Sequence, residues 1–126
     1  MTALLVPIWL IRVAVAAVWL YEGVVCKLVG GEPHQLEVVA QAPFGKQIGR
    51  AFLIALGLVE SALGLWALSG ISPLPCVIAQ TVLLVTLNTN GLIWARKVIH
   101  DPAGMVVKNF AFILLAWVSA SFPRWP

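Results

Sequence analysis

Two ionisable residues lie inside apolar stretches that are long enough to cross a lipid bilayer. Arg12 stands in LLVPIWLIRVAVAAVWL and Glu60 in AFLIALGLVESALGLWAL. A charge within hydrocarbon is costly, so such residues usually face a protein interior and have a partner. Each lies about eight residues from the same membrane face, so they are level and predict a buried ion pair. The pair could form a proton, ion or substrate site, but we favour a structural role because a neutralised pair carries charge poorly.

A second group of polar residues is expected near the opposite membrane face. Its members are Glu22, Lys27, Asn88, Lys108 and Asn109. One interpretation is interfacial charge and helix capping. The other is a cleft open to the cytoplasmic interface, which could hold a quinone-like or anionic head group because many polar groups converge at one depth. Both interpretations stay open.

The elements that position these residues follow from the composition. The chain has 126 residues, of which 61% are hydrophobic and 10% charged, whereas soluble domains carry roughly 25% charged residues. A spanning helix needs about 20 mostly apolar residues, and four stretches qualify: 4–24, 49–68, 75–95 and 105–122. We therefore predict an all-α fold, an integral membrane four-helix bundle that forms a single transmembrane domain over residues 1–126.

The distribution of basic residues predicts how the chain is threaded. Four spans place both termini on one face, where Arg124 is the only basic residue outside the spans. The opposite face collects Lys27, Lys46, Arg50, Arg96, Lys97 and Lys108. Short cytoplasmic loops carry the Lys and Arg excess, so we expect the termini outside and the longer connections in the cytoplasm. The charge excess sets topology in this interpretation and does not indicate nucleic-acid binding.

The connections and aromatic residues agree with these spans. A proline at the start of segment 32–40, with Leu36, Val39 and Ala40 on one face, predicts a short amphipathic interfacial helix between the first two spans. Aromatic residues are expected to form a belt at each membrane interface. The belt near the terminal face would contain Trp66, Trp117 and Trp125. The belt near the other face would contain Trp19, Tyr21 and Trp94.

Familiar catalytic and metal-binding motifs are not found in the sequence. Cys26 and Cys76 fall near opposite faces, too far apart for a disulfide, and are expected to be buried small residues. His34 and His100 lie outside the spans, so they cannot hold a haem between helices. No residue could perform redox chemistry alone, and any such chemistry would belong to a bound cofactor or partner.

Several short motifs, taken in order, resemble the DoxX-like family of small membrane proteins. They are Arg12 followed by WLYEG at 19–23 and by Lys27, EPHQLE at 32–37, GLVESALG at 57–64, and HDP at 100–102 ahead of VKN at 107–109. The resemblance covers nearly the whole chain and implies a four-helix membrane bundle. Some members of the family that the chain resembles are associated with thiosulfate oxidation that passes electrons to quinone, and others with membrane-bound antioxidant assemblies.

Three functions are open for a chain of this kind in the cell membrane. The first is a non-catalytic, redox-linked accessory or anchor subunit with a quinone or lipid-head-group cleft, working with a larger redox complex. The second is a structural or assembly subunit of a larger membrane complex. The third is a small oligomeric carrier, which is disfavoured because the deep charge in the first span is Arg12 and not an acidic residue.

Overall fold

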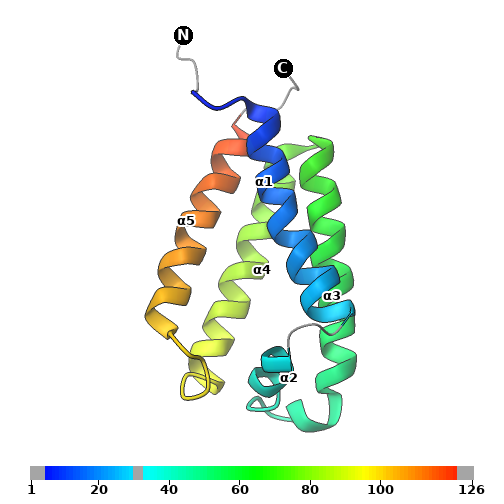
Figure 1. Ribbon diagram of the computed structural model, residues 1–126, viewed down its shortest axis with the longest axis vertical. Coiled ribbons are helices and arrows are strands. Elements are labelled where there is room, and N and C mark those ends of the chain that lie inside the picture. The colour runs from blue at the N-terminus through cyan, green and yellow to red at the C-terminus, as the bar shows by residue number, and fades with distance from the viewer. Residues whose placement is uncertain (1–4, 30–32, 122–126) are drawn as a thin grey trace.

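The computed structural model describes residues 5–29 and 33–121 as a bundle of helices. In Figure 1 the helices run up and down the long axis of the molecule. In chain order they are α1 (Ile8–Leu20), which continues directly as the π-helix η1 (Tyr21–Leu28), α2 (Pro33–Val39), α3 (Gly45–Ser69), α4 (Pro73–Trp94) and α5 (Pro102–Ala120). Four of these segments, counting α1 and η1 as one, are long and apolar enough to cross a membrane. The all-α fold and the short helix between the first two spans are confirmed.

The first span lies further along the chain than its predicted range of 4–24. It begins at Ile8 and runs to Leu28. Pro7 has an extended backbone and precedes the helix as its N-cap. A residue before proline avoids the helical region, so the helix does not continue back through Val6. Residues 1–4, 30–32 and 122–126, which include Arg124 and Trp125, lie outside the described residues.

Turn chemistry sets the ends of the other spans. Gly70 adopts a left-handed backbone, with φ of 73°, directly after α3, a conformation that glycine takes at no steric cost. Asp101 caps α5, because its side chain accepts a hydrogen bond from the backbone N–H of Gly104 at 3.1 Å. Pro102 follows at the first helical position, where a missing N–H costs nothing. The segment at 100–102 therefore leads into the start of α5.

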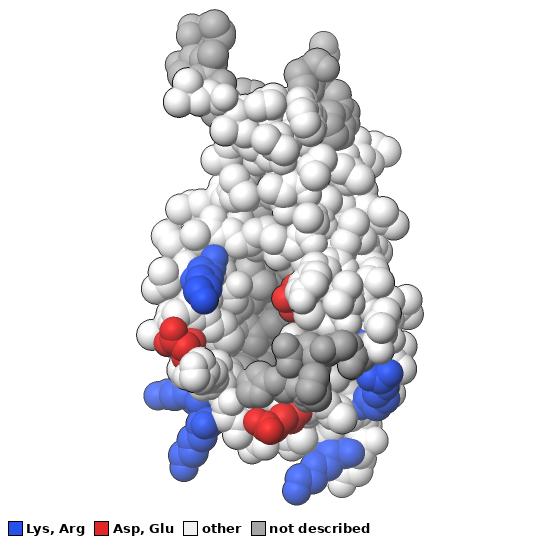
Figure 2. All heavy atoms as spheres, in the orientation of Figure 1, with Lys and Arg blue, Asp and Glu red and all other residues white. Residues whose placement is uncertain are grey.

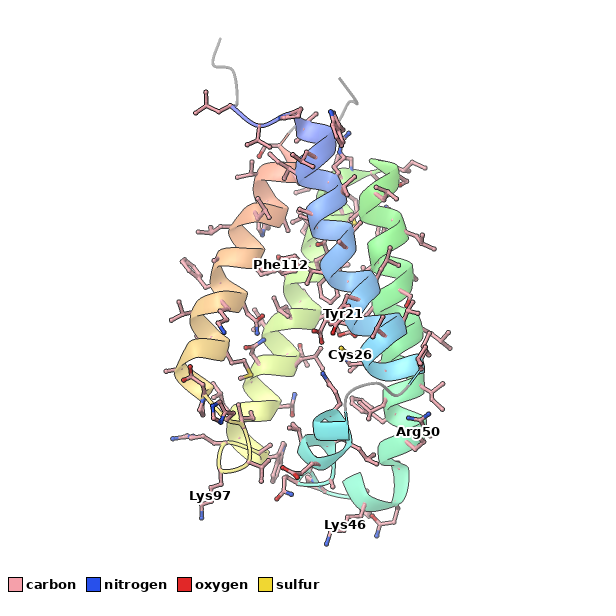
Figure 3. All side chains as sticks on the ribbon, in the orientation of Figure 1. Tyr21, Cys26, Lys46, Arg50, Lys97 and Phe112 are labelled. Atoms are coloured by element: carbon pink, nitrogen blue, oxygen red, sulfur yellow. The ribbon has the colours of Figure 1, made fainter. Side chains whose placement is uncertain are left out.

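The two ends of the bundle differ in charge. The terminal end is where α1 begins and α5 ends (Figure 1). The basic end is the opposite one, where Lys46, Arg50 and Lys97 lie (Figure 3). This arrangement agrees with the predicted threading of the four spans, while the side of the membrane on which each end lies stays a prediction.

The hydrophobic core occupies the half of the bundle toward the terminal end. It is built from Val15, Trp19, Leu63, Ala67, Cys76, Val77 and Ala116. Trp19 was expected at an interface, but it is only 2% exposed. Its indole N–H donates to Gln80 Oε1 at 2.8 Å, and its ring packs edge-on against Phe112. Because the first span extends to Leu28, Trp19 lies well inside the bundle.

Candidate functional site

The half of the bundle toward the basic end is hollow. It contains a cavity of about 730 Å³, which lies within the range of roughly 300–1,000 Å³ found for small-molecule sites. Trp19 and Phe112 line it on the side of the core, and α2 contributes Gln35, Val38 and Val39. Figure 2 shows a hollow on this face of the molecule, with basic and acidic side chains at its edge.

All five residues of the predicted cleft line this one cavity. Glu22 and Lys27 come from η1, Asn88 from α4, and Lys108 and Asn109 from α5. Three elements that are distant in the sequence therefore bring the expected polar groups together. The binding of a ligand by them stays a prediction.

Glu60 also lines the cavity, and its ion-pair partner corrects the expected one. Glu60 Oε1 lies 2.8 Å from Lys27 Nζ, and both side chains are 4% exposed. The predicted partner, Arg12, instead lies about two helical turns closer to the terminal end. The contacts between α3 and α1 show this difference in depth. Gly64, one turn from Glu60 toward the terminal end, lies against Ala16 and Leu20 of α1.

The correction has a physical cause in the limits of the first two spans. Arg12 is only one turn from the start of α1 at Ile8, whereas Glu60 is more than two turns from the end of α3 at Ser69. The two residues therefore lie at different depths. The predicted start of the first span at residue 4 made them appear level.

A close helix crossing brings Lys27 within reach of Glu60. A Cβ atom on Gly23 would lie 2.7 Å from the carbonyl oxygen of Gly57, and one on Gly57 would lie 3.0 Å from the Cβ of Lys27. Small residues let membrane helices approach this closely. The glycines at positions 23 and 57 therefore place η1 against α3 at the level of the ion pair.

The π-helical winding of η1 brings a second carboxylate to Lys27. Glu22 Oε1 lies 3.4 Å from Lys27 Nζ. In an α-helix residues five positions apart point about 140° away from each other. A π-helix has i→i+5 hydrogen bonds, so residues with this spacing come to the same side. Lys27 therefore bridges Glu22 and Glu60.

Helix α2 adds a residue that sequence reasoning missed. Gln35 Nε2 donates to Glu22 Oε1 at 3.4 Å, and Gln35 lines the cavity. Leu36 and Val39 of the same helix pack over Gly49 of α3. The polar position of Gln35 beside the apolar face of the predicted short helix was the available signal, but nothing in the sequence directed it toward Glu22.

The opposite wall of the cavity carries amides and one further cation. Asn109 Nδ2 donates to Asn88 Oδ1 at 2.9 Å, and Asn88 Nδ2 donates to the backbone oxygen of Leu84 at 2.8 Å. Lys108 is exposed and lines the cavity. Within residues 5–29 and 33–121, no hydrogen bond or ion pair is made by its ammonium group. Lys108 is therefore available to a ligand.

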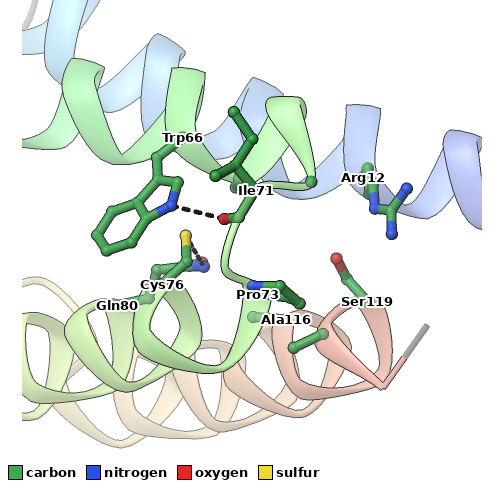
Figure 4. A pocket seen from close by; sticks show the side chains of 11 residues that line it. Arg12, Trp66, Ile71, Pro73, Cys76, Gln80, Ala116 and Ser119 are labelled. Carbon is green, nitrogen blue, oxygen red and sulfur yellow. Dashed lines mark hydrogen bonds between the residues drawn. The ribbon is translucent and has the colours of Figure 1, made fainter. Parts of the chain in front are cut away.

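Arg12 occupies a separate, much smaller pocket near the terminal end (Figure 4). Arg12 is 1% exposed, and the pocket of about 10 Å³ has room for one water molecule at most. Gly70 and Ser119 also line it, at the C-terminal ends of α3 and α5. A cation is favoured at such helix ends. This surrounding fits a structural role for Arg12.

The two cysteines lie in different parts of the bundle. Cys26 belongs to η1 and Cys76 to the first turns of α4, and both are buried. Gln80 donates to Cys76 Sγ at 3.4 Å. In the part of the chain that the structure describes, no three His, Cys, Asp or Glu residues are grouped so that they could hold a metal ion.

The fold and the cavity define a small, multi-pass, all-helical membrane protein. Residues 16–117 match the DoxX-like family, and since this is most of the chain, the protein belongs to that family. The matched range contains all the charged residues that line the large cavity and leaves Arg12 outside. No curated protein and no solved structure matches the chain.

Proposed function

We propose that this protein is a non-catalytic, redox-linked accessory or anchor subunit that holds a quinone-like molecule near its basic end. The observation that carries the proposal is the cavity of about 730 Å³. Ligand sites of this size combine mainly apolar walls with a few convergent polar groups. Here Phe52, Leu56 and Met105 are among the apolar lining residues, and Lys108 and Asn109 are among the polar ones.

The position of the cavity suits a molecule that is dissolved in the membrane. Phe52, Trp94 and Lys108 line the cavity and are exposed, so the cavity is open at these residues. A lipid-soluble ligand could therefore enter from the bilayer and keep its tail outside. The apolar walls would hold the ring of a quinone, while the Lys108 ammonium group would donate to one of its carbonyl oxygens.

The cavity also bears on the other two functions. An assembly subunit needs only a solid bundle with a face for its partner, and the hollow half of this bundle would add nothing to that role. A proton-coupled carrier would need an acidic group that is not already neutralised, but the deeply buried Glu60 is held by Lys27 at 2.8 Å. Both observations favour the ligand-binding subunit.

The basic end of the bundle is proposed to face the cytoplasm. Lys46, Arg50 and Lys97 lie there (Figure 3), and cytoplasmic loops carry the excess of Lys and Arg. The cavity would then open near the cytoplasmic interface of the cell membrane, where a soluble or membrane-bound redox partner could reach its ligand.

The test is a titration of the detergent-purified protein with decylubiquinone, in which binding is measured by the quenching of tryptophan fluorescence. We expect saturable quenching that falls in Trp94→Phe, which removes an indole from the cavity lining, and persists in Trp66→Phe, which removes one beside the small pocket. Mass spectrometry of organic extracts of the purified protein would show whether a native quinone copurifies.

A matched pair of lysine variants then tests the site itself. Lys108→Gln should weaken binding roughly tenfold, the value of one charge-assisted hydrogen bond. Lys46→Gln removes the same charge from an exposed residue that does not line the cavity and should bind like the wild type. If quenching does not saturate, or if both variants bind alike, the quinone site is rejected and the assembly subunit becomes the better proposal.

A further inference from the structure

We propose that the cavity binds the reduced, quinol form of its ligand more tightly than the quinone form. This inference rests on the proposed function and specifies the chemistry of the same site. It follows from an asymmetry between the two walls. The wall formed by η1 and α3 offers the ligand only hydrogen-bond acceptors, and the wall formed by α5 offers donors.

The acceptor wall consists of Glu22 and Glu60 with Lys27 between them. A lysine ammonium group has three N–H donors. Three acceptors surround Lys27 Nζ: Glu60 Oε1 at 2.8 Å, Glu22 Oε1 at 3.4 Å and the backbone oxygen of Glu22 at 3.5 Å. The ammonium group of Lys27 is therefore directed at protein oxygens. The remaining carboxylate oxygens can only accept.

The indole donor nearby is also committed, since the Trp19 N–H donates to Gln80. Gln35 of α2 donates one amide hydrogen to Glu22 and keeps a second one, so the acceptor surface is limited to Glu22 and Glu60 themselves. A ligand atom facing these two carboxylates meets lone pairs, unless it brings its own hydrogen.

The donor wall lies on the other side of the bundle, on α5 (Figure 1). Lys108 presents an ammonium group whose N–H donors are not used by any of the described residues. Asn109 donates one amide hydrogen to Asn88, and the second one is left for a ligand. A ligand oxygen facing α5 is therefore best placed as an acceptor.

A quinol matches both walls, while a quinone matches only one. The two carbonyl oxygens of a quinone accept hydrogen bonds, so the oxygen that faces Glu22 and Glu60 would be opposed by their lone pairs. A quinol hydroxyl at the same place donates to a carboxylate, and its second oxygen still accepts from Lys108. A hydrogen bond to a charged group changes affinity by roughly ten- to a hundredfold.

Equilibrium dialysis of the detergent-purified protein under argon tests the preference with three probes. They are decylhydroquinone, decylbenzoquinone and the dimethyl ether of decylhydroquinone, which keeps the aromatic ring and both oxygens of the quinol but has no O–H to donate. We expect the hydroquinone to bind at least about tenfold more tightly than the other two. If the three probes bind equally, the inference fails although the proposed site stands. If none of them binds, the proposed function itself fails.

A matched pair of variants assigns the preference to the acidic wall. Glu22→Gln supplies an amide N–H that can donate to a quinone carbonyl, so the affinity ratio should fall toward one. Since the Glu22 side chain is 40% exposed, the variant should keep the fold, which circular dichroism checks. Glu37→Gln makes the same change on an exposed residue of α2 that does not line the cavity and should keep the full ratio. An unchanged ratio in Glu22→Gln would overturn the inference.

Discussion

Breaking the buried ion pair between Lys27 and Glu60 should show which basic residue of the first span lies at the depth of Glu60. Both side chains are 4% exposed and their charged atoms are 2.8 Å apart. Lys27→Met would leave Glu60 buried without its cation. Such an uncompensated charge typically costs 3–5 kcal/mol, so we expect a loss of about that size in the free energy of unfolding.

The other variants of the cycle should behave differently. At 2.8 Å two unit charges attract by about 6 kcal/mol with an effective dielectric constant of about 20, but desolvation of both groups offsets most of this. Glu60→Leu should cost less than Lys27→Met, because Lys27 keeps Glu22 at 3.4 Å. The double variant should lie close to the wild type, since both buried charges are gone. With the double variant close to the wild type, the coupling energy equals the sum of the two single losses, which is at least about 3–5 kcal/mol.

Unfolding by sodium dodecyl sulfate in mixed micelles, followed by circular dichroism, gives the four free energies of each cycle. The control cycle pairs Arg12→Met with Glu60→Leu. Because these residues lie about two turns apart in depth, their effects should add to within about 0.5 kcal/mol. A larger coupling for Arg12 with Glu60 than for Lys27 with Glu60 would refute the difference in depth described above.

The remaining predictions concern helix packing and orientation. Gly23→Ala should lower stability by roughly 1–3 kcal/mol in the same assay, because its Cβ would lie 2.7 Å from the oxygen of Gly57. In contrast, the Cβ of Gly91→Ala would meet only side-chain atoms, at 3.4 and 4.0 Å, and the variant should be tolerated. For orientation, an impermeant thiol reagent applied to intact cells should label Ile71→Cys, in the turn at the terminal end, and should not label Lys97→Cys at the basic end. The opposite labelling pattern would invert the proposed topology.

The sequence predicted which polar residues lie together better than it predicted their partners. The five residues of the predicted cleft, from Glu22 to Asn109, all line one cavity, because depth in the membrane follows from position along each span, while their role in binding a ligand stays a prediction. Glu60 was recognised as a buried charge with a partner, for the same reason. Its assignment to Arg12 was wrong, because the relative depth of two helices depends on where each helix begins.

Two local features of the first span could not be derived from its composition. Because α1 starts after Pro7, the first span lies further along the chain than predicted, and Trp19 lies in the core and not at an interface. The π-helical winding of η1 turned Glu22 and Lys27 to the same side, where α-helical spacing would have separated them.

The sequence by itself determined that this protein is a four-span, all-helical membrane protein with polar groups gathered near one end. This follows because the length of each apolar stretch and the positions of the charges are given by the sequence. They can be compared directly with the thickness of a bilayer. Only the tertiary structure decided that Lys27 bridges Glu22 and Glu60, and that the bundle is hollow beside them. The first outcome depends on how closely the backbones of Gly23 and Gly57 approach, and both depend on packing between helices that no single span encodes.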